Sequence, residues 1–205
     1  MPFKLPDMPF MTAPLVYLAG DLVFRPDALG LFARLKAICA RHGLEGCAPF
    51  DGQDAVRGLA PSRETTMKII EADRDLMDRC VAGLFCIDPF RRAADMDPGT
   101  AVEIGYMHAQ RKPLEGYTAD PRPYGAKVES YWREAWGFEL RPRENAGDIG
   151  SGSLEDPDGI LVHSDGMAQN GMVDGFITLS GGRISGAPTL EEAFEKAAMT
   201  LAARL

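Results

Sequence analysis

Two carboxylates that could act together chemically stand in the segment DPGTAVEIGYMHAQRKP, residues 97–113. Glu103 lies among small and apolar residues of an expected helix, and Asp97 precedes that helix, followed by Pro-Gly. A carboxylate that apolar neighbours keep partly out of water can attack an electrophilic sugar carbon, and a second carboxylic acid is then needed to protonate the leaving group. The same residues also fit a structural role, because Thr100-x-x-Glu103 matches a capping box and Asp97 is favourable at the positive end of a helix dipole.

A third carboxylate, Asp73, is a second candidate for the acid. It lies in the segment EADRD near the end of a helix expected over residues 62–80, where the ordinary interpretation is a solvated acidic face. Leu76 and Met77 follow it on the side of the helix that should pack inward. This spacing favours Asp73 over Asp75 for a role in a site.

Strands and helices are expected to alternate along the first part of the chain. Short apolar runs that end at turn residues predict strands within 14–20, 45–53, 81–88 and 112–118. Helical spacing of apolar residues predicts helices over 26–43, 62–80 and about 99–110, with Met67, Ile70, Leu76 and Met77 on the packing stripe of the second. Such alternation argues for a parallel sheet with helices on both faces, in which ligands bind beyond the carboxyl ends of the strands.

The remainder of the chain is expected to complete a single domain. Residues 119–158 are rich in Pro, Gly and charged residues, which predicts an irregular insertion with one short helix packed by Trp132 and Trp136. Residues 189–205 have the pattern of a C-terminal amphipathic helix. A length of 205 residues is ordinary for one domain.

The composition argues against several kinds of partner. A net charge of -8 disfavours binding to a nucleic-acid backbone. No apolar run reaches membrane-spanning length, and residues 1–14 lack the pattern of a signal peptide, so we expect a cytoplasmic protein. No CxxC pair occurs, and the histidines share no ligand spacing with the cysteines, so we expect no metal and reduced, buried thiols. The four cysteines are Cys39, Cys47, Cys80 and Cys86.

In their order along the chain, these motifs resemble the nucleoside 2-deoxyribosyltransferases. The matching stretches are VYLAGDLVF, PFDGQ, ADRDLMDRCVAGLFCID, DPGTAVEIGYMHAQRKP and, nearer the C-terminus, QNGMVD. The likeness spans nearly the whole chain except the insertion around 119–158, and DPGTAVEIGY is its most specific piece. The resemblance implies a flavodoxin-like α/β fold and a double-displacement reaction that needs no cofactor.

The resemblance also implies roles for the three carboxylates. Glu103 would be the nucleophile that forms a covalent 2-deoxyribosyl-enzyme at C1′ of the sugar. Asp73 and Asp97 would hold the nucleobase and manage its proton as it leaves and returns. The substrates would be a deoxynucleoside and a free nucleobase, in an activity of nucleotide salvage.

Five further residues match positions that bind substrate in the family. Gln53 would face the base with Asp51 beside it, and Tyr17 and Gly20 would line the sugar pocket. Asn170 would reach the site of a neighbouring subunit and bind the sugar 5′-hydroxyl, which implies a homo-oligomer with shared active sites. Structural alternatives stay open for three of them. Gln53 could satisfy a turn, Tyr17 could belong to the core, and Asn170 could cap a helix or form a turn.

Two other functions compete with base exchange. The first is a hydrolase of nucleosides or of deoxynucleoside 5′-monophosphates, which the same superfamily contains. The first loop presents Asp21, which would repel a phosphate, and Arg25 alone is thin support for one, so a nucleoside substrate is favoured. The second is a non-catalytic nucleotide-sensing module. An unpaired buried glutamate such as Glu103 is costly to keep, which argues against a protein that only binds.

Overall fold

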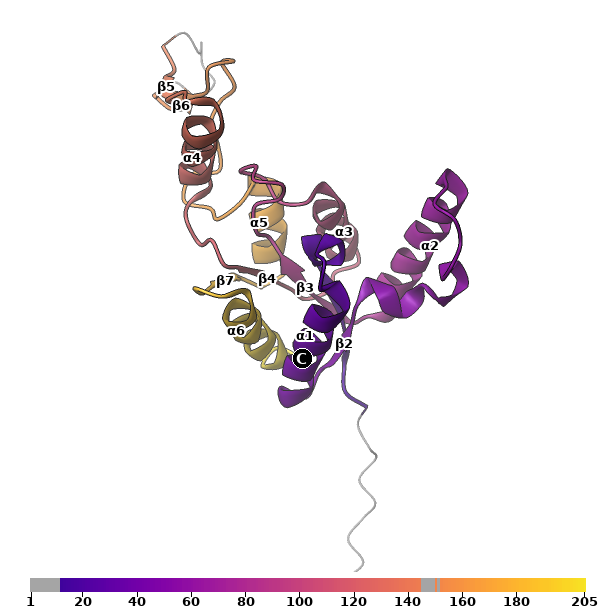
Figure 1. The fold of residues 1–205 in the computed structure, drawn as a ribbon. Helices are drawn as coiled ribbons and strands as arrows, with labels where there is room; N and C mark the ends of the chain where they lie inside the picture. The colour runs from indigo at the N-terminus through magenta and orange to yellow at the C-terminus, as the bar shows by residue number, and fades with distance from the viewer. Residues whose placement is uncertain (1–11, 145–149, 151) are drawn as a thin grey trace, which may run out of the picture.

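The computed structural model describes residues 12–144, 150 and 152–205. A five-stranded sheet lies at its centre, with helices above and below (Figure 1). Neighbouring strands are parallel, in the order β2-β1-β3-β4-β7, which is the order of a flavodoxin-like sheet. The predicted α/β class and parallel sheet are therefore confirmed. The strands are β1 (Leu15–Ala19), β2 (Glu45–Cys47), β3 (Ala82–Cys86), β4 (Leu114–Thr118) and β7 (Ile184–Gly186).

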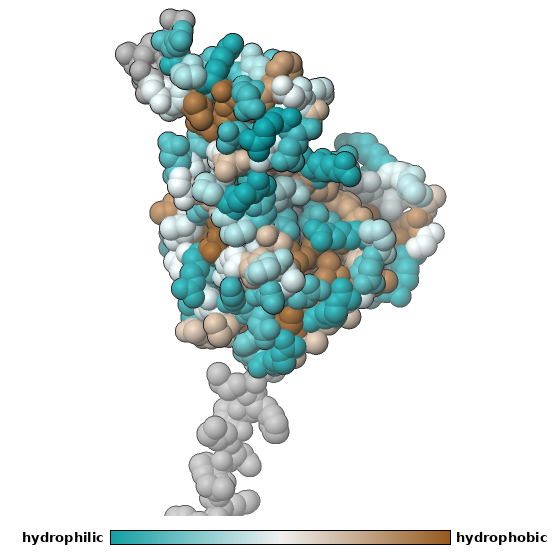
Figure 2. All heavy atoms as spheres, turned by 60° about the vertical axis from the view of Figure 1, so that its left-hand side comes forward, coloured by the Kyte–Doolittle hydropathy of each residue, from teal (hydrophilic) through white to brown (hydrophobic). Residues whose placement is uncertain are grey.

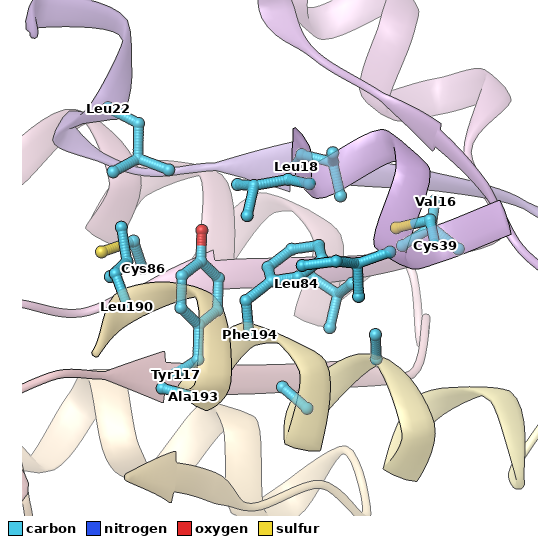
Figure 3. Close-up of a cluster of buried hydrophobic side chains, with 14 of the residues drawn as sticks. Val16, Leu18, Leu22, Cys39, Leu84, Cys86, Tyr117, Leu190, Ala193 and Phe194 are labelled. Carbon is cyan, nitrogen blue, oxygen red and sulfur yellow. The ribbon is translucent and has the colours of Figure 1, made fainter. Parts of the chain in front are cut away.

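The helices divide between the two faces of the sheet. Helices α1 (Ala28–Arg41) and α6 (Leu190–Ala202) cover one face, and α2 (Arg63–Arg79), α3 (Pro98–Ala109) and α5 (Gly171–Leu179) belong to the other (Figure 1). Successive residues of a strand point to opposite faces. Leu18 accordingly lies in the core under α1 and α6, which Figure 3 shows with Leu84 and Phe194, whereas Tyr17 lies in the core on the other face. Tyr17 thus points towards the helix that carries Glu103.

Short 3-10 turns follow the first two strands at their carboxyl ends. They are η1 (Asp21–Phe24), η2 (Pro49–Gly52) and η3 (Asp54–Val56). Gly20 joins β1 to η1 with φ of 147°, a value that side chains rarely allow. A Cβ there would lie 2.4 Å from the Cβ of Cys86 at the end of β3. Glycine is therefore required for the chain to pass so close to β3.

The predicted insertion contains more regular structure than expected. Helix α4 (Tyr124–Trp136) has 13 residues and begins well before the aromatic cluster, and β5 (Arg141–Pro142) pairs with β6 (Leu154–Glu155). These elements form an arm at the top of Figure 1, and Figure 2 shows apolar surface on it. Residues 145–149 and 151 of the insertion lie outside the described residues. So do residues 1–11, on which the expected localisation partly rested.

Helix α2 corrects one expectation about packing. Leu76 and Met77 are buried as predicted, but Met67 and Ile70 are 41% and 53% exposed. Only the C-terminal end of α2 packs against the sheet, and its first turns project away from the body (Figure 1). Their place on the packing stripe was therefore predicted wrongly. Within the described residues, no helix combines the length and apolarity needed to span a membrane.

Candidate active site

Glu103 meets a tyrosine from the central sheet. The Tyr17 hydroxyl donates a hydrogen bond of 2.6 Å to Oε1 of Glu103. Burial raises the pKa of the Glu103 carboxyl to about 7, with the hydrogen bond from Tyr17 acting in the opposite direction and the negative charges of Asp73 and Asp97 raising it further. Tyr17 itself is fully buried, so it is both a core residue and a contact of Glu103. The result is an oriented, partly desolvated carboxylate at the carboxyl end of the sheet.

Asp97 is the N-cap of α3. Its Oδ2 accepts hydrogen bonds from the backbone N–H of Thr100 at 2.9 Å and from the Thr100 hydroxyl at 3.0 Å. The capping box predicted between Thr100 and Glu103 is therefore wrong. Pro98 occupies the first turn, so the helix starts at that residue, ahead of Thr100, and Asp97 caps it. Glu103 is left free to face Tyr17.

Asp73 is linked to Gln53 across the site. The Gln53 side-chain amide donates to Oδ1 of Asp73 at 3.1 Å. Burial raises the pKa of Asp73 to about 6, although the hydrogen bond from Gln53 lowers it. Asp75 is exposed and pairs with Arg74 at 2.7 Å. The geometry therefore separates the two aspartates as the spacing predicted, with Asp73 on the inner side of α2.

Asp51 and Gly20 have local structural partners. The Asp51 carboxylate pairs with Lys36 of α1 at 2.6 Å and accepts from the backbone N–H of Ala48 at 2.8 Å. Both of its oxygens are thus engaged at the end of β2, and the structure gives Asp51 no contact with Glu103. Gly20 permits the close approach of β1 to Cys86 described above. Neither residue joins the two hydrogen-bonded pairs, Tyr17 with Glu103 and Gln53 with Asp73.

Further carboxylates gather where β1 and β3 end. Burial raises the pKa of Asp21, the guanidinium of Arg25 lowers it, and the negative charges of Asp88 and Asp97 raise it. Arg25 pairs with Asp21 at 3.2 Å, so its charge is already balanced. The region where β1 and β3 end is therefore acidic, and a phosphate group there would be repelled.

Asn170 lies on the opposite side of α3 from Glu103. It is the N-cap of α5, where its Oδ1 accepts from the backbone N–H of Met172 at 3.0 Å. It lines an open pocket together with Ala101 of α3. Residues on a helix are spaced by about 100°, so the side chain of Glu103 points about 160° away from that of Ala101. The structure therefore does not bring Asn170 to Glu103 within one chain.

No metal site emerges from the donor side chains. Among the residues that the structure describes, no three His, Cys, Asp or Glu side chains are grouped to hold a metal ion. The four cysteines are buried and free.

Four parts of the fold thus supply the residues near Glu103, namely Tyr17, Gln53, Asp73 and Asp97. Comparison with known proteins indicates which family the chain belongs to. A family model described as nucleoside 2-deoxyribosyltransferase matches residues 16–172, a range that includes every predicted site residue. The chain belongs to the nucleoside 2-deoxyribosyltransferase family. Membership indicates an enzyme of this general kind, with nucleosides and nucleobases as its class of substrates.

Relatives of this deoxyribosyltransferase family member are found in sequence and in structure. An uncharacterized protein of Schizosaccharomyces pombe is 59% identical over 192 residues, which are 94% of this chain and 90% of that protein. A 2-desoxiribosyltransferase from Leishmania mexicana has a TM-score of 0.58 and 24% identity, covering 90% of this chain and 97% of that one. A conserved protein from Enterococcus faecalis V583 has a TM-score of 0.55 and 19% identity, covering 94% and 99%. These two structures show the shared fold.

The residues that hydrogen-bond to the segment between β3 and α3 were not predicted from the sequence. Gln169 is fully buried and hydrogen-bonds to the segment that follows β3, and Tyr124 of the arm donates to Asp95 in the same segment at 2.8 Å. Neither residue type is unusual at its position in the sequence. The one available signal was that Gln169 directly precedes Asn170 in the motif QNGMVD.

Proposed function

We propose that the protein transfers 2-deoxyribose from a deoxynucleoside to a free nucleobase through a covalent intermediate on Glu103. The observation that carries this proposal is the half-buried Glu103 carboxylate, held by the Tyr17 hydroxyl at 2.6 Å with a second carboxyl, Asp73, nearby. A fixed carboxylate of this kind is suited to attack a sugar carbon. Family membership supplies the substrate class.

The reaction would proceed in two displacements. The Glu103 carboxylate attacks C1′, the bond from C1′ to the base nitrogen breaks, and that nitrogen receives a proton from Asp73. An incoming base then attacks C1′, the bond to Glu103 breaks, and the proton of the incoming base returns to Asp73. Gln53 would hold Asp73 in place through their hydrogen bond of 3.1 Å. Asp97, which also raises the pKa of Glu103, would hold the base.

Hydrolysis is the competing outcome, because water can take the sugar from the same intermediate. Glu103 keeps some exposure in the isolated chain, which favours access of water. A deoxynucleoside 5′-monophosphate is a poorer candidate substrate, since Asp21, Asp88 and Asp97 concentrate negative charge where β1 and β3 end.

A product assay tests the proposal. Purified enzyme is incubated with deoxyinosine, with and without adenine, and the products are separated by chromatography. Deoxyadenosine formed only with adenine supports transfer, whereas hypoxanthine and free deoxyribose in both samples would establish a hydrolase. The Glu103→Gln variant should form neither product, and intact mass spectrometry of the wild type with deoxyinosine alone should reveal a deoxyribosyl adduct. An active, folded Glu103→Ala enzyme would overturn the mechanism.

We further propose that Asn170 acts in the site of a neighbouring copy of the chain. Support comes from its place on the far side of α3 from Glu103 and from exposed apolar side chains on α3 and α5, Val102 at 73% and Met172 at 63%. An oligomer could bury both and bring Asn170 to the partner's sugar.

Mixing an inactive variant with one that is weakened on donors carrying a 5′-hydroxyl tests the shared site. Glu103→Ala lacks the nucleophile, and Asn170→Ala lacks the amide. In mixed oligomers, some sites would combine Glu103 from one variant with Asn170 from the other, so activity on deoxyinosine should rise after the subunits exchange. If deoxyinosine activity does not rise in a mixture that gel filtration or native mass spectrometry shows to have exchanged, each site is built within one chain.

A further inference from the structure

A buried amide joins the two parts of the chain that carry the proposed substrate contacts. Gln169 has no exposed surface, although it is polar. Its Nε2 donates to the carbonyl of Ile87 at 3.3 Å and to that of Ala94 at 3.5 Å, and its Oε1 accepts from the backbone N–H of Asn170 at 3.0 Å. The amide thus uses both its donor and its acceptor ends, as a buried amide must to offset its loss of water.

The partners of Gln169 belong to two segments of the chain, one leading to Glu103 and one carrying Asn170. Ile87 directly follows β3, and Ala94 lies in the loop that leads to Asp97 and then to Glu103 on α3. Asn170 begins α5. The Gln169 side chain therefore sets the position of the Asn170 backbone against the loop that delivers the catalytic carboxylates. The length of the Gln169 side chain fixes the distance between the Asn170 backbone and this loop.

The arm holds the same peptide from its other side. Lys127 of α4 is 2% exposed, and its ammonium donates to the carbonyl of Ala168 at 2.7 Å. The backbone N–H of Tyr124 donates to the carbonyl of Met167 at 2.8 Å, while its hydroxyl donates to Asp95. These hydrogen bonds fix residues 167–169, which directly precede Asn170. Asn170 is therefore already restrained before substrate binds, and it loses less conformational entropy on binding.

We propose that Gln169 is a positioning residue, which sets Asn170 for recognition of the sugar 5′-hydroxyl. This inference rests on the proposed function, in which Asn170 binds that hydroxyl. Gln169 touches no substrate. It acts through the Asn170 backbone, so its loss should affect substrates with a 5′-hydroxyl far more than substrates without one.

The experiment compares two donors, 2′-deoxyinosine and 2′,5′-dideoxyinosine, with adenine as the acceptor. The ratio of their kcat/KM values measures how much the enzyme gains from the 5′-hydroxyl. Gln169→Met keeps the approximate length of the side chain but removes its hydrogen bonds, and should lower this ratio by about tenfold, as expected for one misplaced polar contact. The rate on 2′,5′-dideoxyinosine should change by less than about threefold.

Further variants show whether Gln169 acts through Asn170. Asn170→Ala should lose the same preference, and adding Gln169→Met to it should lower the ratio no further, because the two residues act as one unit. Gln169→Glu keeps an oxygen for the Asn170 N–H and regains a donor only when protonated. Its ratio should therefore move towards the wild-type ratio as the pH falls, each pH being compared with wild type.

The outcomes separate this inference from the proposed function. A wild type that transfers deoxyribose with a 5′-hydroxyl preference, and a Gln169→Met variant that keeps that preference, would overturn the positioning role alone. Equal losses on both donors, together with a lower Tm, would also overturn it, because they indicate general structural damage. A wild type that transfers no deoxyribose would remove the proposed function, and the inference with it. If Gln169→Met does not fold, the pH-dependent ratio of Gln169→Glu decides.

Discussion

At the scale of single residues, Glu103 is held where its charge is costly to the fold. Its pKa of about 7 lies above the ordinary value of 4.5, so ionisation is less favourable in the folded chain than in the unfolded one. The contribution of Glu103 to stability is therefore fully present below about pH 4.5 and is lost as the pH rises through about 7. In the nucleophilic role proposed for Glu103, reactivity would be kept at the expense of stability.

We predict that Glu103→Gln makes the protein more stable at alkaline pH while removing transfer. Above pH 7 the variant should gain on the order of 2 kcal/mol in the free energy of unfolding, because the amide carries no charge to desolvate. The gain should vanish near pH 4.5, where the wild-type carboxyl is also neutral. Urea titrations at several pH values measure it. A gain independent of pH would mean that the charge of Glu103 is not the cause.

Asp73 leads to a prediction about the pH profile. The proposed mechanism needs Glu103 ionised and Asp73 protonated, and their pKa values are about 7 and about 6. A plot of kcat/KM against pH should therefore be bell-shaped with its maximum near these values, which belong to the pair of groups rather than to either one. Asp73→Asn should lose the alkaline limb. Its acid limb should remain, because the proposed mechanism still needs Glu103 ionised. An unchanged alkaline limb in Asp73→Asn would rule out Asp73 as the acid.

At the scale of elements, the close passage of β1 over β3 depends on Gly20. We predict that Gly20→Ala lowers the free energy of unfolding by more than about 2 kcal/mol, because its Cβ would lie 2.4 Å from that of Cys86 and its φ is 147°. Gly175→Ala in α5 is the matched control, since a Cβ there meets nothing within 4 Å. It should stabilise by up to about 1 kcal/mol through helix propensity. Urea unfolding of both variants measures the contrast, and equal effects would show that the contact with Cys86 is not what requires glycine.

The elements with continuous apolar runs were the predictable ones. Strand β3 is buried on both faces, so its sequence is a continuous apolar run. Helix α1 is buried along one stripe, so its apolar residues recur at helical spacing. Strand β7 left no such pattern, because it has three residues and only Ser185 is buried. Helix α5 contains Gly171 and Gly175, which weaken a helical prediction, and it forms because of its packing against α3.

Residues of the candidate site could likewise be predicted only where they left a pattern in the sequence. Glu103 was a candidate because a charged residue inside an apolar run is conspicuous, and Asp97 because it precedes Pro-Gly at an expected helix start; the family motif includes both. The link from Tyr17 to Glu103 joins residues 86 positions apart, so it depends on the register of β1 beneath α3. Gln169 gave no signal of its own, because a single uncharged amide says nothing about burial until the fold encloses it.

At the scale of the whole molecule, a buried ion pair fastens the end of the sheet opposite the site. Glu115 in β4 is fully buried and pairs with Arg204, which follows α6. Arg204 also donates to the carbonyl of Ser180 at 2.6 Å and to that of Leu114 at 3.1 Å. One guanidinium therefore joins the start of β4, the end of α5 and the C-terminal end of the chain.

We predict that Arg204→Met lowers the free energy of unfolding by about 3–5 kcal/mol, because it leaves the Glu115 charge buried without a partner. Transfer per folded molecule should be unchanged, since the pair lies at the far end of β4 from Glu103. Arg183→Met is the control, because among the described residues its guanidinium bonds only the Thr200 hydroxyl, at 2.7 Å, and its loss should cost less than about 0.5 kcal/mol. Chemical denaturation and the base-exchange assay give both quantities. A similar loss in the two variants would assign the effect to surface charge.

The two outermost strands of the sheet have a consequence for behaviour at high concentration. β2 and β7 have three residues each, against five in each inner strand. An outer strand presents unpaired backbone N–H and C=O groups, on which another chain can build by adding strands, and a short one offers few of them. β2 also begins with an exposed Glu45, and Pro121, which has no N–H to donate, covers Gly186 of β7. The folded enzyme therefore offers little template for fibril growth, and aggregation should require unfolding first.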